Sequence, residues 1–271
     1  MVLHTRTVVG RDGVTIRDVA CRDMSGRGEA PEQATAYTVV FVRRGCFVRT
    51  ADGMESVCDP TVAYCTSPGD VESFDHPHAT GDDCTAVSFD PSVAISLWGE
   101  ERVRGAIPTP PDFDLAHRIL LAASGRAVDP HEMVESAMTL VARALELTGH
   151  RAVTAGRPAT VRARATVVNH ARQALAADPD LSLSELARAV AVSPHHLSRI
   201  FRRATGRTIS RHRMRLRTRA VLERFVDGER DLARLAADAG FADQSHLCRV
   251  MQAETGSAPS ALRALLTRER S

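Results

Sequence analysis

The stretch Ser182–Gly206, SLSELARAVAVSPHHLSRIFRRATG, has the pattern of two short helices joined by a tight turn. Ser182 is an expected N-cap, and Glu185 three residues later completes an S-x-x-E capping box. Ser193 is the expected N-cap of a second helix, with Pro194 at the first helical position, where no N–H donor is needed. Apolar residues recur at helical spacing in both segments. The stretch therefore predicts a helix-turn-helix unit.

A second stretch, Asp231–Gly256, DLARLAADAGFADQSHLCRVMQAETG, repeats this design, with Gly240 in the turn and Asp243 as the cap of the next helix. Between the two units, Ile209–Val226 contains no proline or glycine and predicts one connecting helix. At 1.5 Å per residue this helix spans on the order of 25 Å. That length is of the order needed to hold two helices in successive major grooves, about 34 Å apart along DNA.

The double unit resembles the DNA-binding domain of the AraC/XylS family of transcriptional regulators. The resemblance is carried by Leu183, Leu186, Ala187, Ser193, the run 196–199, Phe201, Gly206, Ala236 and, above all, by GFADQSHLCRVMQAETGSAP at 240–259. The sequence departs from the family pattern at packing positions, namely Ala191, Ile209, His212 and Met251. The resemblance implies a sequence-specific DNA-binding regulator. It also implies double-stranded DNA as a partner, a homodimer, and RNA polymerase as a candidate partner.

Both expected second helices leave polar side chains opposite their apolar side. The candidate DNA-binding residues are His195, His196, Ser198, Arg199, Arg202, Arg203, Gln244, Ser245, His246 and Arg249. An arginine can pair bidentately with guanine and a glutamine with adenine, so we expect Arg199, Arg249 and Gln244 to contact bases. Arg202, Arg203, Arg207 and the arginine series at 211, 213, 215, 217 and 219 are better suited to phosphate, although some of them must face the core side or pair with acids. The alternative interpretation is a solvated face coated with arginine.

The charge of the chain is unevenly distributed. The formal net charge is only +2, but residues 160–271 hold 20 arginines against 11 acidic residues, a net of +9, while the remainder carries −7. A basic half joined to an acidic half is expected if only one of them binds phosphates. No apolar run is long enough for a membrane span, and the N-terminus lacks the pattern of a secretion signal. We therefore expect a cytoplasmic protein with reduced thiols.

The fold class expected is α+β, with an N-terminal cupin-like β-barrel or sandwich, a helical linker region and a C-terminal all-α double helix-turn-helix domain. The boundaries expected are 1–105, 106–158 and 159–271. Strands are expected at 37–43, 46–50, 54–58, 61–66, 71–74 and 84–89, with Asp52-Gly53 as a hairpin turn. The similarity to cupin-like effector domains rests only on the position of this segment before the DNA-binding domain and on its pattern of short strands.

Helices are expected at 112–124, 129–147 and 161–177, and the stretch 150–158 is expected to be a linker because Gly156 and Pro158 break helices. The second of these helices carries a broad apolar stripe from Met133 to Leu147. We expect part of this stripe to pack on the β domain and part on a second subunit.

Three hypotheses remain open for the N-terminal half: a small-molecule effector domain, a module that only dimerises or contacts proteins, and residual cupin enzymology.

Small buried side chains are the favoured role of the cysteines, and a thiol sensor or soft-metal site built from Cys58, Cys65 and Cys84 is the alternative. The run Phe74–His78, with Asp83 and Cys84 nearby, suggests a metal. A metal-binding cupin would also need an H-x-H motif near Tyr37, and there is none. No metal, no cofactor and no catalytic set is therefore expected.

Overall fold

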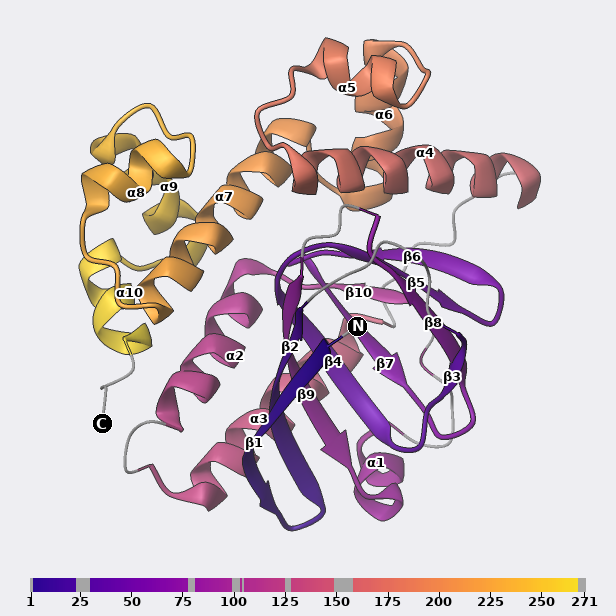
Figure 1. Cartoon of the computed structure of the whole chain (residues 1–271), viewed down its shortest axis with the longest axis vertical. Coiled ribbons are helices and arrows are strands. Elements are labelled where there is room, and N and C mark those ends of the chain that lie inside the picture. The colour runs from indigo at the N-terminus through magenta and orange to yellow at the C-terminus, as the bar shows by residue number, and fades with distance from the viewer. Residues whose placement is uncertain are drawn as a thin grey trace.

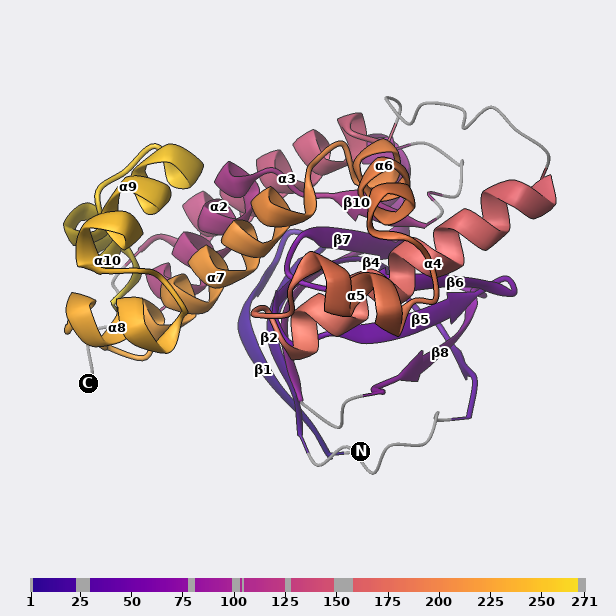
Figure 2. The ribbon, with the colours of Figure 1, turned by 90° about the horizontal axis from the view of Figure 1, so that it is seen from above.

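The computed structural model describes residues 2–22, 30–77, 81–98, 103, 105–124, 128–148 and 158–267. Its N-terminal part is a two-sheet β-barrel, and its C-terminal part is helical (Figure 1). Viewed from above, helices cover one side of the barrel and cross its end (Figure 2). The expected α+β fold class is confirmed. Within the described residues, no helix is long and apolar enough to cross a membrane.

The strands form two antiparallel sheets. Their bounds are β1 Val2–Arg11, β2 Val14–Arg22, β3 Glu32–Gln33, β4 Tyr37–Arg44, β5 Phe47–Ala51, β6 Met54–Cys58, β7 Val62–Thr66, β8 Val71–Asp75, β9 Asp82–Phe89 and β10 Ala106–Pro108. One sheet has the order β1-β2-β9-β4-β7-β10, and the other has the order β3-β8-β5-β6. The strand β10 belongs to the larger sheet, so strand structure extends past the expected boundary at residue 105.

Two of the hairpins turn on an Asp-Gly pair. Asp52 and Gly53 have φ values of 51° and 70°, as the expected hairpin between β5 and β6 requires. Asp12 and Gly13, with φ values of 53° and 73°, make the same kind of turn between β1 and β2. No individual strand is expected from the sequence for this first hairpin, although the same Asp-Gly signal marks it.

The larger sheet separates two apolar layers, because successive side chains of a strand point to opposite faces. On β4, Val39 and Phe41 face a layer shared with the helices, whereas Val40 and Val42 face the smaller sheet. The space between the sheets is filled by side chains that include Phe47, whose ring contacts both Tyr64 and Phe74 edge-on. The interior of the barrel is therefore a packed core rather than an open cup.

Three helices cover the outer face of the larger sheet: α1 Pro91–Trp98, α2 Pro111–Ala123 and α3 Pro130–Glu146. The apolar stripe of α3 is buried within the same chain, with Leu140 at 4% and Ala144 at 0% exposure. The prediction that part of this stripe packs on a second subunit is therefore wrong. The sheet and α2 already cover most of it. Beyond its first residue, the exposed residues of α3 are polar, among them Glu135 and Arg143, and Leu147 at its end is half-buried.

The C-terminal part consists of seven helices within the described residues. They are α4 Pro158–Ala177, α5 Leu183–Ala189, α6 Pro194–Thr205, α7 Ile209–Val226, α8 Leu232–Asp238, α9 Gln244–Thr255 and α10 Pro259–Leu266. The connecting helix α7 has the bounds expected from the sequence. Pro158 starts α4 instead of closing a linker, since proline is tolerated in the first helical turn. The remainder of the expected linker, residues 150–157, lies outside the described residues.

Each helix-turn-helix unit has its own core. In the first, Leu186, Leu197 and Phe201 are almost fully buried against α4. In the second, the core of α8, α9 and α10 is completed from outside by Leu115 and Ile119 of α2. Helix α2 therefore packs on the barrel with one face and on the second unit with the other. It joins the two parts of the molecule rather than forming a separate linker.

Candidate nucleic-acid interface and domain interface

The two units place their second helices, α6 and α9, with the same local chemistry. Ser193 accepts from the backbone N–H of His196 at the start of α6, and Asp243 accepts from that of His246 at the start of α9. Both helices end on a glycine in the left-handed region, with φ values of 71° and 74°. Figure 1 shows the two units at opposite ends of α7. The repeat seen in the sequence is therefore a structural repeat.

The candidate DNA-binding residues all lie on the outside of these helices. The exposed ones are His195, Arg199, Arg202, Arg203, Gln244, Ser245 and Arg249, and the half-buried ones are His196, Ser198 and His246. Along α6 they border a groove of about 700 Å³, together with Leu183, Thr208 and Ser210. Leu183, expected on the apolar face of α5, is instead exposed at this groove. The groove thus has a polar and cationic wall and a small apolar edge.

Two of the candidate histidines already have partners within the protein. His196 Nδ1 lies 3.3 Å from Nη2 of Arg199. His246 Nδ1 accepts from the N–H of Ala242, and its ring packs edge-on against Phe241. These contacts leave Nε2 of each ring for an external partner. Within the described residues, Arg199 and Arg249 form no ion pair, so both guanidinium groups can reach a ligand.

The arginine series on α7 does not form the phosphate-facing row that its spacing suggested. Only Arg211 is exposed. Arg213 donates to the backbone carbonyl of Leu181, and Arg217 donates to that of Gly240 and to Asp180. Arg215 and Arg219 are buried and point toward the barrel. The assignment to phosphate is therefore wrong for Arg213, Arg215, Arg217 and Arg219, whereas the expectation that some of the series pair with acids is confirmed by Arg217 and Arg219.

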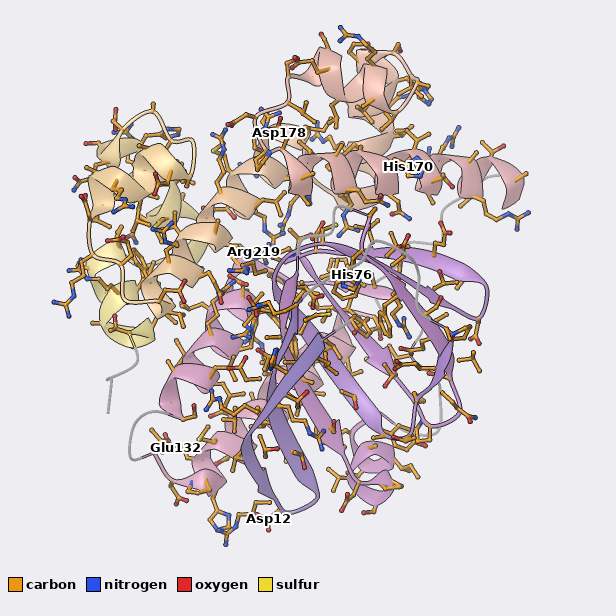
Figure 3. All side chains as sticks on the ribbon, viewed as in Figure 1. Asp12, His76, Glu132, His170, Asp178 and Arg219 are labelled. Carbon is orange, nitrogen blue, oxygen red and sulfur yellow. The ribbon has the colours of Figure 1, made fainter. Side chains whose placement is uncertain are left out.

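The interface between α7 and the N-terminal part contains a buried charge network. Arg219, one of its members, lies between α7 and the barrel (Figure 3). Asp114 of α2 lies 3.3 Å from Nε of both Arg118 and Arg219. Arg118 also donates to Glu223 of α7 and to the backbone carbonyl of Arg43 on β4. Arg215 donates to the carbonyl of Thr109. Some arginines of the basic C-terminal half are therefore used to bind acidic residues and carbonyl groups of the N-terminal half.

A second buried pair joins α4 to the barrel. Nη2 of Arg172 lies 2.8 Å from Oδ2 of Asp59, a fully buried carboxylate that also accepts from Thr61. His212 of α7 lies 3.8 Å from the same carboxylate. Burial alone would raise the pKa of Asp59, but the charge of Arg172, together with the hydrogen bonds from Thr61, outweighs it and lowers this pKa to about 2. Asp59 is therefore held as a carboxylate at the domain interface.

Two histidines in these networks are held neutral by burial. Burial lowers the pKa of His212 to about 4, against the opposing attraction of Asp59. Burial also lowers the pKa of His117 to about 4; its ring stacks on Phe41 and contacts Asp114. Both side chains therefore enter the folded interface without charge at neutral pH.

A cavity of about 460 Å³ lies between the barrel and the helical part. Its walls come from β5, β6 and β7, from α4, and from the α6–α7 connection. Val57, Val62 and Val168 supply apolar surface, while Arg207 and Arg215 bring positive charge. The Nη1 atom of Arg207 is buried and has no hydrogen-bond partner among the described residues. The cavity therefore combines apolar walls with a guanidinium nitrogen that has no hydrogen-bond partner in the described part of the chain.

The structure brings together residues that no local sequence pattern connects. Asp59, Asp114 and Glu223 had no sequence signal, because nothing in the local pattern shows which acid faces which arginine.

Cys21, His76 and Asp82 also meet inside the barrel, with ligand atoms within 4.8 Å of one another. All six cysteines lie within the described residues, and none forms a disulfide. Cys58, Cys65 and Cys84 do not form a common cluster, since Cys65 lies in the layer shared with the helices and the other two lie in the layer between the two sheets.

Comparison with known proteins agrees with this geometry for the C-terminal part. Residues 186–265, from α5 to α10, match a family model described as "Helix-turn-helix domain". No curated protein sequence matches the chain.

Among solved structures, the chain is similar to the apo form of a ToxT point variant from Vibrio cholerae strain SCE256, at 10% identity and a TM-score of 0.40, covering 96% of this chain and 100% of that one. It is also similar to wild-type ToxT from the same strain bound to an unsaturated fatty acid, at 10% identity and a TM-score of 0.36, covering 97% and 100%. A cupin superfamily protein from Desulfitobacterium hafniense matches at 14% identity and a TM-score of 0.28, covering 32% of this chain and 76% of that one. The family match agrees with the repeated capping and with the exposed faces of α6 and α9. The C-terminal region of this chain is therefore a helix-turn-helix domain of the AraC type.

Proposed function

We propose that this protein is a sequence-specific transcriptional regulator in which α6 and α9 enter successive major grooves of DNA. The observation that carries the proposal is the matched exposure of Arg199 and Arg249. Each lies six positions after the N-cap of its helix, and each directly precedes a residue, Ile200 or Val250, that packs toward the core. A guanidinium held in this way presents a fixed pair of donors to the O6 and N7 atoms of guanine.

The proposal is tested by selecting fragments from randomised DNA with the purified full-length chain. We expect a motif with two conserved blocks whose centres lie about one helical turn, roughly 10 base pairs, apart. The absence of any enriched motif, with binding governed only by salt, would contradict base recognition. A motif confined to one block would contradict the role of one of the two helices.

We further propose that a small molecule in the interdomain cavity controls how the two parts of the chain are docked. The barrel interior is filled by side chains, so the cavity against α4 and α7 is the better site for an effector. The unpartnered Nη1 of Arg207, beside apolar walls, favours a ligand with an acidic group on an apolar body. A ligand bound in the cavity would change contacts on both sides of the interface, because the walls of the cavity belong to both parts of the chain.

A thermal-shift series separates this effector hypothesis from a module that only dimerises or contacts proteins. Medium-chain carboxylic acids should raise the melting temperature, and their neutral amides should do so less. Arg207→Gln should remove the difference, while Arg188→Gln, at an exposed position on α5, should keep it. Equal effects of acids and amides on the parent protein would argue against an acidic effector.

The homodimer, the contact with RNA polymerase and the cytoplasmic location remain predictions from the sequence.

A further inference from the structure

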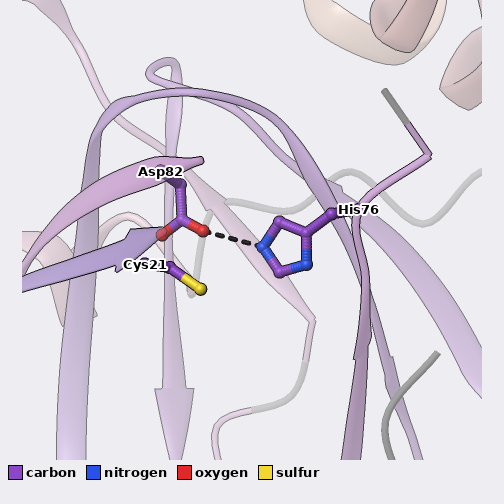
Figure 4. Close-up of side chains that lie close together, drawn as sticks. All are labelled: Cys21, His76 and Asp82. Atoms are coloured by element: carbon purple, nitrogen blue, oxygen red, sulfur yellow. Dashed lines mark hydrogen bonds and ion pairs between the residues drawn. The ribbon is translucent and has the colours of Figure 1, made fainter. Parts of the chain in front are cut away.

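The barrel interior contains one cluster of potential metal ligands within the described residues. Cys21 lies near the end of β2, Asp82 begins β9, and His76 directly follows β8. All three side chains are buried, with exposures of 3%, 5% and 5%. Figure 4 shows the thiol and the carboxylate on the same side of the imidazole ring, next to its Nε2 atom. Two strands of the larger sheet and one of the smaller sheet therefore contribute to a single point.

The backbone around this point is arranged for close approach. Cys21 and Asp82 are direct partners in the register of β2 and β9, so their side chains leave the same face of the sheet. A Cβ atom on Gly81 would lie 2.3 Å from the carbonyl oxygen of Cys21. A Cβ atom on Gly45, which has a φ of +86°, would lie 2.8 Å from Cα of Asp82. Only glycine at both positions allows the start of β9 to sit this close to its neighbours.

The side chains are also held in place by their neighbours. His76 Nε2 lies 2.7 Å from Oδ1 of Asp82, and its ring packs against Phe47 at a centroid distance of 5.5 Å. The thiol of Cys84 donates to the other carboxylate oxygen of Asp82 at 3.3 Å. Cys84 is thus a further sulfur donor next to the cluster, on the interior face of β9.

A cysteine, a histidine and an aspartate could also form a nucleophile, base and orienting acid. That arrangement needs the thiol on one ring nitrogen and the carboxylate on the other. Here the thiol and the carboxylate lie beside the same nitrogen, and Nδ1 points away from both (Figure 4). Convergence of sulfur, nitrogen and oxygen on one point is the arrangement of metal ligands, and this mixed donor set suits Zn²⁺.

We propose that Cys21, His76 and Asp82 bind one zinc ion, which joins the two sheets at this end of the barrel. Cys84 is the nearest donor for the fourth position of a tetrahedral site. The hydrogen bond between His76 and Asp82 would give way to metal ligation by both side chains. Because its ligands belong to both sheets, the ion should stabilise the folded barrel by mass action. This proposal is independent of the DNA-binding function.

The test uses the full-length chain, reduced and stripped of metal, with Co²⁺ as a spectroscopic probe and Zn²⁺ as its competitor. We expect a single equivalent of Co²⁺ to produce a near-ultraviolet thiolate-to-cobalt charge-transfer band that Zn²⁺ abolishes. Zn²⁺ should also raise the melting temperature. Cys21→Ser and His76→Gln should each weaken Zn²⁺ binding by at least about tenfold. The matched control is Cys65→Ser, a buried cysteine on the opposite face of the larger sheet, which should retain the band.

Failure of the folded parent protein to give the band would overturn the proposal. Unchanged affinity for Zn²⁺ in Cys21→Ser, or an equal loss of affinity in Cys65→Ser, would also overturn it. Cooperative melting without metal identifies a variant that is folded. If Cys21→Ser does not fold, His76→Gln provides the same comparison through the imidazole ligand.

Discussion

Nε of Arg219 on α7 lies 3.3 Å from Oδ1 of Asp114 on α2, and the two residues are only 3% and 2% exposed. The pair joins the DNA-binding domain to the helical cover of the barrel. Burial alone would raise the pKa of Asp114, but Arg118 and Arg219 outweigh it and hold this pKa well below its usual range. The docking of the two domains therefore depends on a charge pair that solvent does not screen.

Loss of this carboxylate should destabilise the protein strongly. Asp114→Asn leaves Arg118 paired with Glu223 alone and leaves the buried guanidinium of Arg219 with only Thr109 as a neutral partner. Breaking a buried pair in this way costs about 3–5 kcal/mol. The control is Asp112→Asn on the same helix, whose pair with Arg143 is exposed and should contribute less than about 1 kcal/mol. Chemical denaturation of both variants measures the difference. Equal stability of the two variants would contradict the importance of the buried network.

The stability of the protein should fall as the pH is lowered from about 6.5 to 4. Because burial lowers the pKa of His212 and His117 to about 4, the unfolded chain binds protons in this range and the folded chain does not. Each histidine should cost on the order of 2–3 kcal/mol at the low end of the range. His212→Phe should remove about half of this loss, since phenylalanine can keep the edge-on contact with Phe201.

Denaturation at several pH values checks this prediction. His170→Phe, at an exposed position on α4, should leave the pH dependence as in the parent protein. A second decline is expected as the pH falls from about 4 to 2, where Asp59 becomes protonated, because its pKa is lowered to about 2. An unchanged profile in His212→Phe would show that this histidine is not held neutral in the folded state.

The turns of the two helix-turn-helix units should respond in opposite ways to exchange of alanine and glycine. Ala191 has a φ of 54° in the first turn, at the place of Gly240, with a φ of 70°, in the second. Ala191→Gly should relieve left-handed strain and stabilise the protein by up to about 1 kcal/mol. Gly240→Ala should destabilise it, since the added Cβ would lie 2.9 Å from the guanidinium of Arg217. Thermal unfolding of the two variants provides the measurement, and destabilisation by both would show that Ala191 is not strained.

Arginines on α6 and α9 should determine sequence preference, whereas buried arginines on α7 should not. Arg199→Ala should relax the preference in one block of the motif and Arg249→Ala in the other, each by about 1–3 kcal/mol of discrimination. Arg215→Ala should lower stability and leave the motif intact, because its guanidinium bonds to Thr109 within the chain. Selection from randomised DNA with each variant is the measurement. An unchanged motif for both Arg199→Ala and Arg249→Ala would rule out base contact by these residues.

Charges placed on the apolar stripe of α3 should unfold the N-terminal part rather than only separate subunits. Leu140→Glu puts a carboxylate into the chain's own core, at a cost of several kcal/mol. Glu135→Arg, on the exposed side of the same helix, should keep the fold. Circular dichroism and sedimentation together check this expectation. A folded Leu140→Glu protein with reduced mass would restore the stripe as a subunit interface.

The sequence by itself determined the parts of the molecule whose signals are local. Caps, helical periodicity and turn residues predicted α5 to α9, and the bounds of α7 agree to the residue. Asp52-Gly53 predicted the hairpin of β5 and β6, because two residues with positive φ favour that turn. The candidate DNA-binding residues were found in the same way, since the apolar face of a helix defines its opposite face.

The tertiary structure decided which residues face one another across distant segments. Alternating arginines on α7 could not show that Arg215 and Arg219 are buried, because the acids and carbonyls that receive them lie on α2 and the segment before it. The stripe of α3 is apolar whether a sheet or a subunit covers it, and only packing distinguishes the two. The register of β2 and β9 likewise brings Cys21 to Asp82. Sequence patterns specify faces, whereas long-range pairing depends on how the whole chain packs.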